Sequence, residues 1–459
     1  MSSLLLYSQQ SEVLVLKEKI RSVWALPELR NKILFVVFAL LIFRIGATIP
    51  VPYINTEYLQ QFFAINSGTL FGMLNTLSGS ALSRATLFAL SIQPYINASI
   101  IIQLLTIAIP SLERLQKDGG EEGKKKIQSI TRYSTLGIGL LQGFGYYMLI
   151  RSYNLLVDTG VWAGIVIILS FTAGALFLMW LGEQITEHGV GNGISIILFA
   201  GIVSRIPHVV QYMFQAVRNY GTDTSEWTEA QIANLHTLHP ALLPILIVGV
   251  IALIAFVVFI YNSERKVPVQ YAKRVVGRKS YGGHSTHIPI KVNLSGVLPI
   301  IFAQSIIMLP ATIAMFVPAS RQEGTGWYKF IQFFNSTNWI YIILYFLLII
   351  AFSYFYATIQ FNPTEVANNL KKNGGFVPGF RPGSPTAEFL SGILGRLTFF
   401  GAIYLGIVAI IPLLFERFTG FTNLGIGGTS VIIVVGVALE TVKQLEAQML
   451  MRHYKGFLS

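Results

Sequence analysis

The chain has 459 residues, of which 53% are hydrophobic and only 12% are charged, and its mean hydropathy is +0.60. A soluble domain usually carries about 25% charged residues, so this composition excludes an ordinary soluble protein and indicates a membrane protein. The formal net charge of +12 favours anionic lipid or an anionic partner, and the absence of cysteine excludes disulfides and thiolate metal sites.

The first 32 residues are mixed polar and basic and do not resemble a cleavable signal peptide. Ten apolar runs follow, each long enough to cross a bilayer. Because the bilayer core offers no water to unpaired backbone groups, such runs form helices, and we expect an all-α polytopic membrane protein. The runs are residues 33–49, 87–109, 133–150, 161–181, 194–217, 241–261, 293–317, 338–361, 389–414 and 426–449.

The runs divide into an N-terminal half, residues 33–217, and a C-terminal half, residues 241–449. A polar external segment, 218–240, lies between the halves, and a tail, 450–459, follows them. The second run of each half is interrupted, by "SIQPYINAS" in one and by "SGVLPIIFAQS" in the other. Interruptions at corresponding positions of two halves indicate an inverted repeat with its working site at the repeat interface. The alternative is that Pro and Gly are simply common in membrane helices.

Between the first two runs lies the stretch 67–84, "SGTLFGMLNTLSGSALSR", which is partly apolar but too short to span a bilayer. Segments of this kind are often re-entrant, and irregular backbone enters a membrane only where protein or a water-filled cavity surrounds it. We therefore expect a cavity open to the outer side. A surface helix on the outer face is the alternative.

Basic residues are concentrated in the N-terminal segment, in alternate connecting segments and in the tail, so the positive-inside rule predicts that both termini are cytoplasmic. The segment 183–190 is an exception, because it has Glu183, Glu187 and His188 but no Lys or Arg. Attraction to anionic lipid can explain the basic segment 110–132. The segment 262–291 extends far from either span, and its basic residues favour a polyanionic or acidic cytoplasmic partner.

A second short helix is expected after the eighth run. Asn362 is placed to cap its N-terminus, with Pro363 at the first helical position. Lys371 and Lys372 fall in the last turn, where the helix dipole favours cations, and Gly374 or Gly375 can end the helix.

The remainder of the segment 361–388 contains "GGFVPGFRPG". Three prolines restrict its backbone, which lowers the entropy lost on docking to a partner. We therefore expect a stiff tip that displays Arg381. The prolines are Pro378, Pro382 and Pro385.

The sequence has no signature of an enzyme. It has no GxxxxGK[ST] or HExxH motif, and "GVGNG" follows a helix rather than a strand. His284 and His287 have no carboxylate near them, so we expect neither a metal site nor a cofactor. Arg44 and Arg396 lie near the ends of spans and can snorkel. A solute transporter would bury more carboxylates.

Several long stretches resemble the SecY family, the channel-forming subunits of the bacterial protein translocase, and the resemblance extends from about residue 28 to 450. They are "FRIGATIPVP", "SGSALSRATLFALSIQPYINASIIIQLL", "FLMWLGEQITEHGVGNGISIILFAGIV", "STHIPIKVNLSGVLPIIFAQSII", "FNPTEVANNLKKNGGFVPGFRPG" and "GGTSVIIVVGVALETVKQ".

The resemblance implies ten transmembrane helices in two pseudosymmetric inverted five-helix halves around a central hourglass pore. Such a channel translocates unfolded secretory polypeptides and releases transmembrane segments laterally into the lipid. A re-entrant plug at about 65–80 would block the resting pore, and its residues are Phe71, Gly72, Met73, Leu74, Asn75, Thr76 and Leu77. The pore ring would be Ile92, Ile96, Ile194, Leu198, Ile301 and Ile433. The lateral gate would include Gln93, Asn97, Gln304 and Ser305.

The resemblance also implies that the basic segments bind the ribosome, through ribosomal RNA, or the SecA ATPase. The docking residues would be Lys273, Arg274, Arg278, Lys279, Lys371, Lys372 and Arg381. Other implied partners are SecE-like and SecG-like subunits, signal sequences, nascent polypeptides and anionic lipids. The implied location is the bacterial plasma membrane. An inverted-repeat secondary transporter and an insertase without a through-pore are the alternative functions.

Overall fold

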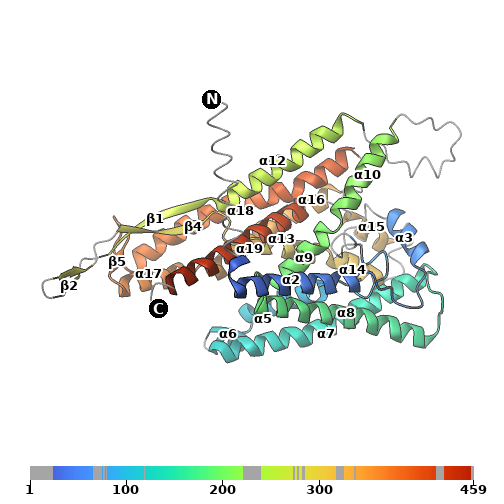
Figure 1. Ribbon diagram of the computed structural model, residues 1–459, viewed down its shortest axis with the longest axis horizontal. Coiled ribbons are helices and arrows are strands. Elements are labelled where there is room, and N and C mark those ends of the chain that lie inside the picture. The colour runs from blue at the N-terminus through green and yellow to red at the C-terminus, as the bar shows by residue number, and fades with distance from the viewer. Residues whose placement is uncertain are drawn as a thin grey trace. The chain divides into compact units, whose positions relative to one another are not determined.

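The structure is a computed structural model of the chain, mostly helical, with strands in one region (Figure 1). It describes residues 24–65, 75, 78, 80–117, 119–220, 239–271, 274–276, 279–281, 285–316, 325–334, 338–419 and 428–455. Among these residues five helices are long and apolar enough to cross a membrane, or six if one bent pair forms a single span. The chain forms two compact units: Met1–Phe62, Leu74–Ser204 and Val437–Ser459 make up the first, and Phe63–Met73 and Arg205–Gly436 the second.

Neighbouring helices of the first unit pack closely through glycine. A Cβ atom added at Gly139 would lie 3.3 Å from Cγ2 of Thr172, and one added at Gly143 would lie 3.3 Å from the carbonyl oxygen of Ile168. Small residues at such positions let two helix backbones approach each other, which is how membrane helices commonly associate. The unit's helices are α2 (Pro27–Gly46), α5 (Gln93–Ala108), α6 (Pro110–Lys117), α7 (Gly120–Ser152), α8 (Val161–His188) and α9 (Gly193–Val203), and α3 (Thr56–Ile65) is divided between the units.

The run expected at 87–109 is not one straight helix. Residues 87–92 form turns, with Ser91 at φ 51°, and α5 begins only at Gln93. Helix α6 then leaves α5 at an angle of 105°. Pro94 and Pro110 stand in the first turns of the two helices, where proline is tolerated because the N–H that it lacks would have no partner there. Ile109, the residue before Pro110, has extended backbone, which is the conformation that proline favours in the residue before it.

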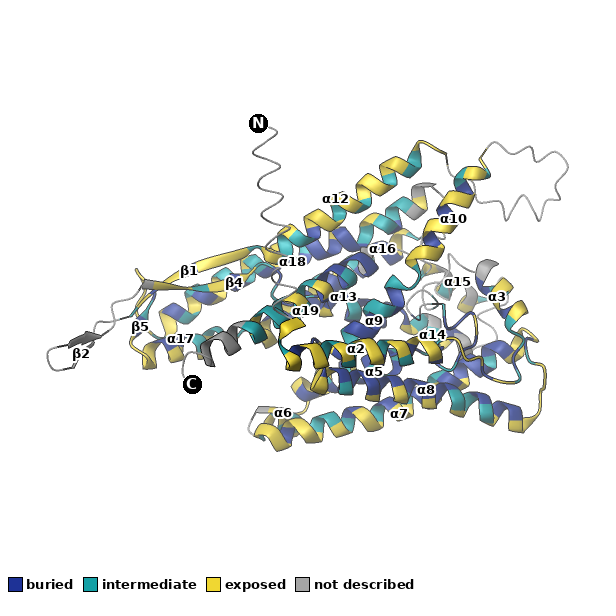
Figure 2. Cartoon of the chain, viewed as in Figure 1, coloured by how far each residue is buried: buried dark blue, intermediate teal, exposed yellow. Residues whose placement is uncertain are grey.

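The second unit is built around α16, which packs against α13 and α18. The ring of Phe302 on α13 meets the rings of Phe352 and Tyr356 on α16 at 5.9 and 4.9 Å between centroids. Helix α12 is apolar but largely exposed, with Val257 as its one buried residue (Figure 2). The unit's helices are α10 (Ile206–Arg218), α12 (Leu242–Asn262), α13 (Leu298–Ile307), α14 (Leu309–Phe316), α15 (Gly326–Phe333), α16 (Trp339–Gln360), α17 (Pro363–Lys372) and α18 (Ser384–Thr419), and α19 (Gly428–Lys455) is divided between the units.

The all-α expectation is wrong for the segment 262–291, which contains a β-hairpin. Val267 and Val269 point inward while their neighbours are exposed, and this period of two is typical of a strand. The main sheet has the order β4-β1-β5, with both pairs antiparallel. Its strands are β1 (Glu264–Tyr271), β4 (Ser285–Lys291) and β5 (Gly375–Phe376), and a second, two-stranded sheet contains β2 (Arg274–Val276) and β3 (Lys279–Tyr281).

The hairpin, α17 and the start of α18 share one hydrophobic cluster. Its buried residues come from all these elements, so the two basic segments form one packed body rather than two separate loops. We call this body, with β5, the strand–helix module. The buried residues of the cluster are Val267, Val269, Ile290, Leu370, Val377 and Leu390.

Candidate functional site

Four of the six predicted ring residues lie in the first unit as two pairs. Ile92 and Ile96 stand at the start of α5 and are 0% and 5% exposed. Ile194 and Leu198 stand in the first turns of α9, where Leu198 is buried and Ile194 is partly exposed. The spacing of four residues places Ile194 and Leu198 on one face of α9. Ile92 is the N-cap residue of α5 and precedes the helix, so a shared helix face for Ile92 and Ile96 stays a prediction.

The two other predicted ring residues lie in the second unit. Ile301 is partly exposed on α13, and Ile433 is 1% exposed on α19. That all six close one ring stays a prediction.

One residue of the predicted plug, Asn75, lies among the described residues, and the other six lie outside them. The carbonyl oxygen of Asn75 accepts hydrogen bonds from the hydroxyl of Ser78 at 3.0 Å and from the amide of Ser80 at 2.9 Å. Its side-chain oxygen accepts one from the amide of Ser83 at 2.9 Å. Asn75 therefore anchors the chain to the turns that lead into α5.

The predicted gate residues stand on two helices of different units, so a seam between those helices stays a prediction. Gln93 and Asn97 on α5 are partly exposed. Gln304 and Ser305 on α13 are buried. The hydroxyl of Ser305 donates to the carbonyl oxygen of Ile301 at 2.9 Å, within its own helix.

The short helix expected after the eighth run is present as α17. The side-chain oxygen of Asn362 accepts hydrogen bonds from the amides of Thr364 at 3.2 Å and Glu365 at 3.3 Å, so the predicted N-cap is confirmed. Lys371 and Lys372 are exposed in the last turn. Gly374 then adopts φ 70°, which a residue with a side chain rarely takes.

Of the docking residues expected in the first basic segment, Arg274 is on β2 and Lys279 is on β3 of the small hairpin. Lys273 and Arg278 lie outside the described residues. Among the described residues no group of three or more His, Asp or Glu side chains is arranged to hold a metal ion.

The tip that carries Arg381 is held by groups that sequence reasoning missed. The hydroxyl of Thr386, a residue 1% exposed, donates to the carbonyl oxygen of Arg381 at 2.8 Å. The ring of Phe380 stacks on that of Phe389 with 4.0 Å between centroids. These contacts hold the backbone at Arg381, while its side chain stays exposed and its guanidinium remains available to a partner. A threonine in the first turn of α18, close after a Pro-Gly turn, is the one local signal that sequence offered.

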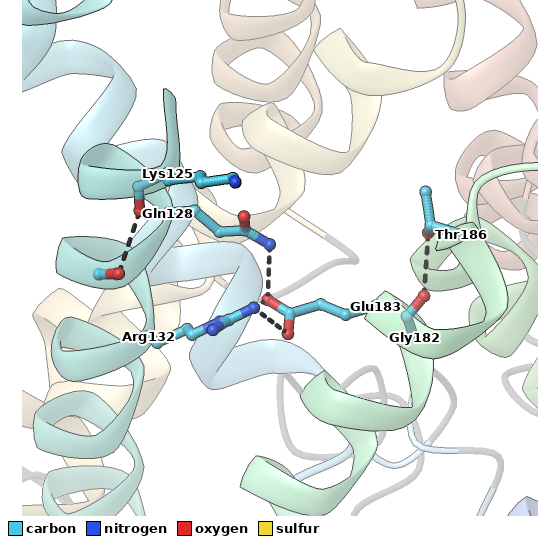
Figure 3. A network of polar contacts seen from close by, with 7 residues as sticks. Lys125, Gln128, Arg132, Gly182, Glu183 and Thr186 are labelled. Carbon is cyan, nitrogen blue, oxygen red and sulfur yellow. Dashed lines mark hydrogen bonds and ion pairs between the residues drawn. The ribbon is translucent and has the colours of Figure 1, made fainter. Parts of the chain in front are cut away.

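A second missed arrangement joins α7 to α8 (Figure 3). Nε of Arg132 lies 2.9 Å from Oε1 of Glu183, and Nη2 of Arg132 lies 2.9 Å from Oε2. The two contacts make a bidentate ion pair. Nε2 of Gln128 donates to the same carboxylate at 3.1 Å. Glu183 is 8% exposed, and its hydrogen bond raises the pKa of the Arg132 guanidinium, which therefore stays charged. The sequence marked Glu183 only as an exception in the charge distribution.

The same end of α8 is tied to the start of α9. The hydroxyl of Thr186 donates to the carbonyl oxygen of Gly182 and accepts from the amide of Gly193, both at 2.9 Å (Figure 3 labels Thr186 and Gly182). A Cβ atom at Gly193 would lie only 1.9 Å from the Gly182 oxygen, so glycine is required there. We call Arg132, Gly182, Glu183, Thr186 and Gly193 the α7–α8–α9 joint.

Sequence reasoning also missed Arg205, which lies in the middle of the run 194–217. Its Nη1 atom is buried and has no hydrogen-bond partner among the described residues. An arginine inside an apolar run is a signal that sequence does contain, since charged residues in such runs are rare and often functional.

Comparisons with known proteins agree with the resemblance. A model of the SecY family matches residues 86–442. The chain is similar to the protein translocase subunit SecY of Streptomyces galbus, at 43% identity over 447 residues, and to that of Bacillus subtilis (strain 168), at 44% identity over 436 residues. Both similarities cover 94% of this chain and 97% of the relative.

Three solved structures have a similar fold, each covering 91% of this chain and 92% of the other. A protein-conducting channel has a TM-score of 0.58 at 19% identity. A SecY protein whose plug domain is described as stabilising the closed channel and maintaining a membrane seal has a TM-score of 0.56 at 18% identity. Sec61 in the canine ribosome–channel complex from the endoplasmic reticulum has a TM-score of 0.54 at 18% identity. At these identities the likeness establishes a shared fold.

Proposed function

Because this chain belongs to the SecY family, we propose that it is the channel-forming subunit of a protein translocase. It is a channel and not an enzyme, and it conducts unfolded secretory polypeptides across the membrane and releases transmembrane segments laterally into the lipid. The observation that carries this proposal is the extent of the similarity, because 43% and 44% identity over 94% of the chain includes both halves. A secondary transporter has no comparable support.

We propose that ten spans in two inverted halves surround the pore in a bacterial plasma membrane, with both termini cytoplasmic. Each apolar run found in the sequence contains helix in the structure, although some runs are bent or interrupted. Such interruptions support the proposal, because broken helices in a membrane are tolerated where they line a cavity or are buried in protein.

The proposed constriction is the ring of six aliphatic residues named above. An apolar ring excludes ions because a narrow apolar passage does not wet, yet it can open around any polypeptide without selecting a sequence. The burial of Ile92, Ile96 and Leu198 supports the proposal, since these side chains face protein rather than lipid. The segment that contains Asn75 would be the plug, and α5 and α13 would form the lateral gate.

The strand–helix module is the proposed docking surface for the ribosome or for the SecA ATPase. Its exposed Lys371, Lys372 and Arg381 suit a polyanion such as ribosomal RNA. A similar fold occurs in a solved ribosome–channel complex, which favours a ribosome as one partner. SecE-like and SecG-like subunits and anionic lipids complete the proposed assembly.

The experiment that tests this function measures ion flux through the reconstituted channel without substrate. Replacing Ile92 and Ile96 with serine should make the resting membrane leak, because the narrow zone becomes easier to wet. Deleting residues 67–78 should also cause leak. The matched controls are Ile101→Ser and Ile107→Ser, on the exposed side of α5, which should stay tight. Equal leak in ring and control variants, or no leak in either at matched insertion, would remove the ring from the mechanism.

A further inference from the structure

We propose that the α7–α8–α9 joint positions Ile194 and Leu198 in the closed constriction, with Thr186 and the Arg132–Glu183 ion pair as its positioning residues. This inference rests on the proposed pore ring. It adds residues outside the ring that set how firmly the resting pore closes.

The first argument concerns how α9 begins. The first amides of a helix have no partner inside the helix. In α9 the amide of Gly193 donates to Thr186, and the amides of Ile194 and Ser195 donate to the side-chain oxygen of Asn192 at 3.1 and 3.2 Å. The Asn192 cap is local to α9. The hydrogen bond from the Gly193 amide to the Thr186 hydroxyl ties the first turn of α9 to α8. This bond therefore fixes where Ile194 lies along α8.

The second argument concerns contact at the crossing of the two helices. A Cβ atom at Gly182 would lie 3.2 Å from Cγ1 of Ile194 and 3.5 Å from Cδ1 of Ile197. The side chain of Ile194 therefore packs directly on the backbone of α8 at Gly182. Because packed contacts transmit small displacements, a shift of α8 moves the ring residue with it.

The third argument concerns what holds α8. Glu183 follows Gly182 in sequence, and its carboxylate is bound by Nε and Nη2 of Arg132 (Figure 3). A bidentate pair fixes direction as well as distance. Arg132 lies on α7, which packs against α5, the helix that carries Ile96 and follows directly after Ile92. Both pairs of ring residues in the first unit therefore depend on one scaffold.

A purely structural role is the competing explanation. Loss of helix packing alone would lower the amount of correctly inserted channel. Loss of positioning would raise the resting ion flux of each inserted channel. The test therefore records flux normalised to inserted protein, together with export of a substrate that has a defective signal sequence.

The decisive variant is Thr186→Val, which keeps the side-chain shape and removes the hydroxyl. We expect the normalised resting leak to rise about fivefold, the shift that loss of one hydrogen bond gives to a closed–open equilibrium. Thr186→Ser should restore tightness. The control is Thr172→Val on the same helix, because the Thr172 hydroxyl donates only to the carbonyl oxygen of Ile168, one turn earlier in α8.

The ion pair is tested separately. Glu183→Gln and Arg132→Glu should each raise the leak, and the reversed double variant Arg132→Glu/Glu183→Arg should leak less than Arg132→Glu alone. Ile194→Ser serves as the ring reference. If Ile194→Ser leaks while Thr186→Val and Glu183→Gln stay as tight as the wild type, the positioning inference is wrong and the ring stands. If Ile194→Ser stays tight, the proposed ring fails, and the inference fails with it whatever the joint variants do.

Discussion

Replacing Thr386 with valine tests how the tip that displays Arg381 is held. Valine has the shape of threonine but no hydroxyl, so the change removes the 2.8 Å hydrogen bond to the Arg381 carbonyl oxygen and preserves packing at a buried position. The stacked rings of Phe380 and Phe389 remain. The tip then loses one of its restraints while the guanidinium itself is unchanged.

The expected magnitude follows from the surroundings of the bond. A typical intramolecular hydrogen bond contributes about 1 kcal/mol, and a buried acceptor left without a partner costs about 1–3 kcal/mol. This hydrogen bond is only partly buried, so the smaller figure applies. Since about 1.4 kcal/mol corresponds to a factor of 10 in affinity, we expect partner binding to weaken by roughly fivefold.

The assay is a binding titration of the reconstituted channel against purified ribosomes, and separately against the motor ATPase. Thr386→Ser keeps the hydroxyl and should bind as the wild type does. If Thr386→Val binds with unchanged affinity, the hydrogen bond does not preorganise the tip. If the serine variant is as weak as the valine variant, packing rather than the hydroxyl is responsible.

Three further predictions concern topology, charge and close packing. Cytoplasmic reporters should be active when fused after residue 375 and inactive after residue 225, and the reverse pattern would overturn the orientation. Arg381→Glu should abolish translocation while the protein still inserts, because it places a like charge against an acidic partner or repels a polyanion; normal export by a well-expressed variant would contradict this. Gly193→Ala should destabilise the channel by about 1–3 kcal/mol in unfolding assays, because its Cβ would lie 1.9 Å from a backbone oxygen. Gly249→Ala, in open space on α12, is its control and should have no such effect.

The sequence by itself determined the features whose causes lie within a few residues. The cap of α17 was predictable, because Asn362 bonds to amides two and three positions away. The apolar runs predicted helices because a membrane leaves the backbone no other partners. The interruption of the second run was visible as Pro94, because proline is tolerated in the first turn of a helix but not in its interior. Family membership could also be predicted, because the long motifs that carry the resemblance are read directly from the sequence.

The tertiary structure decided the features whose partners are far apart in the chain. Strand β1 was missed because two inward-facing valines in a basic segment are a weak pattern, and its pairing with β5 joins Gln270 to Phe376. The ion pair of Arg132 and Glu183 spans 51 residues. Both groups are charged residues near the ends of apolar runs, where a solvated position is the usual expectation. The ion pair forms only because α7 and α8 approach each other closely. A hydrogen bond needs its two groups within about 3 Å, and sequence spacing does not set the distance between residues on separate helices.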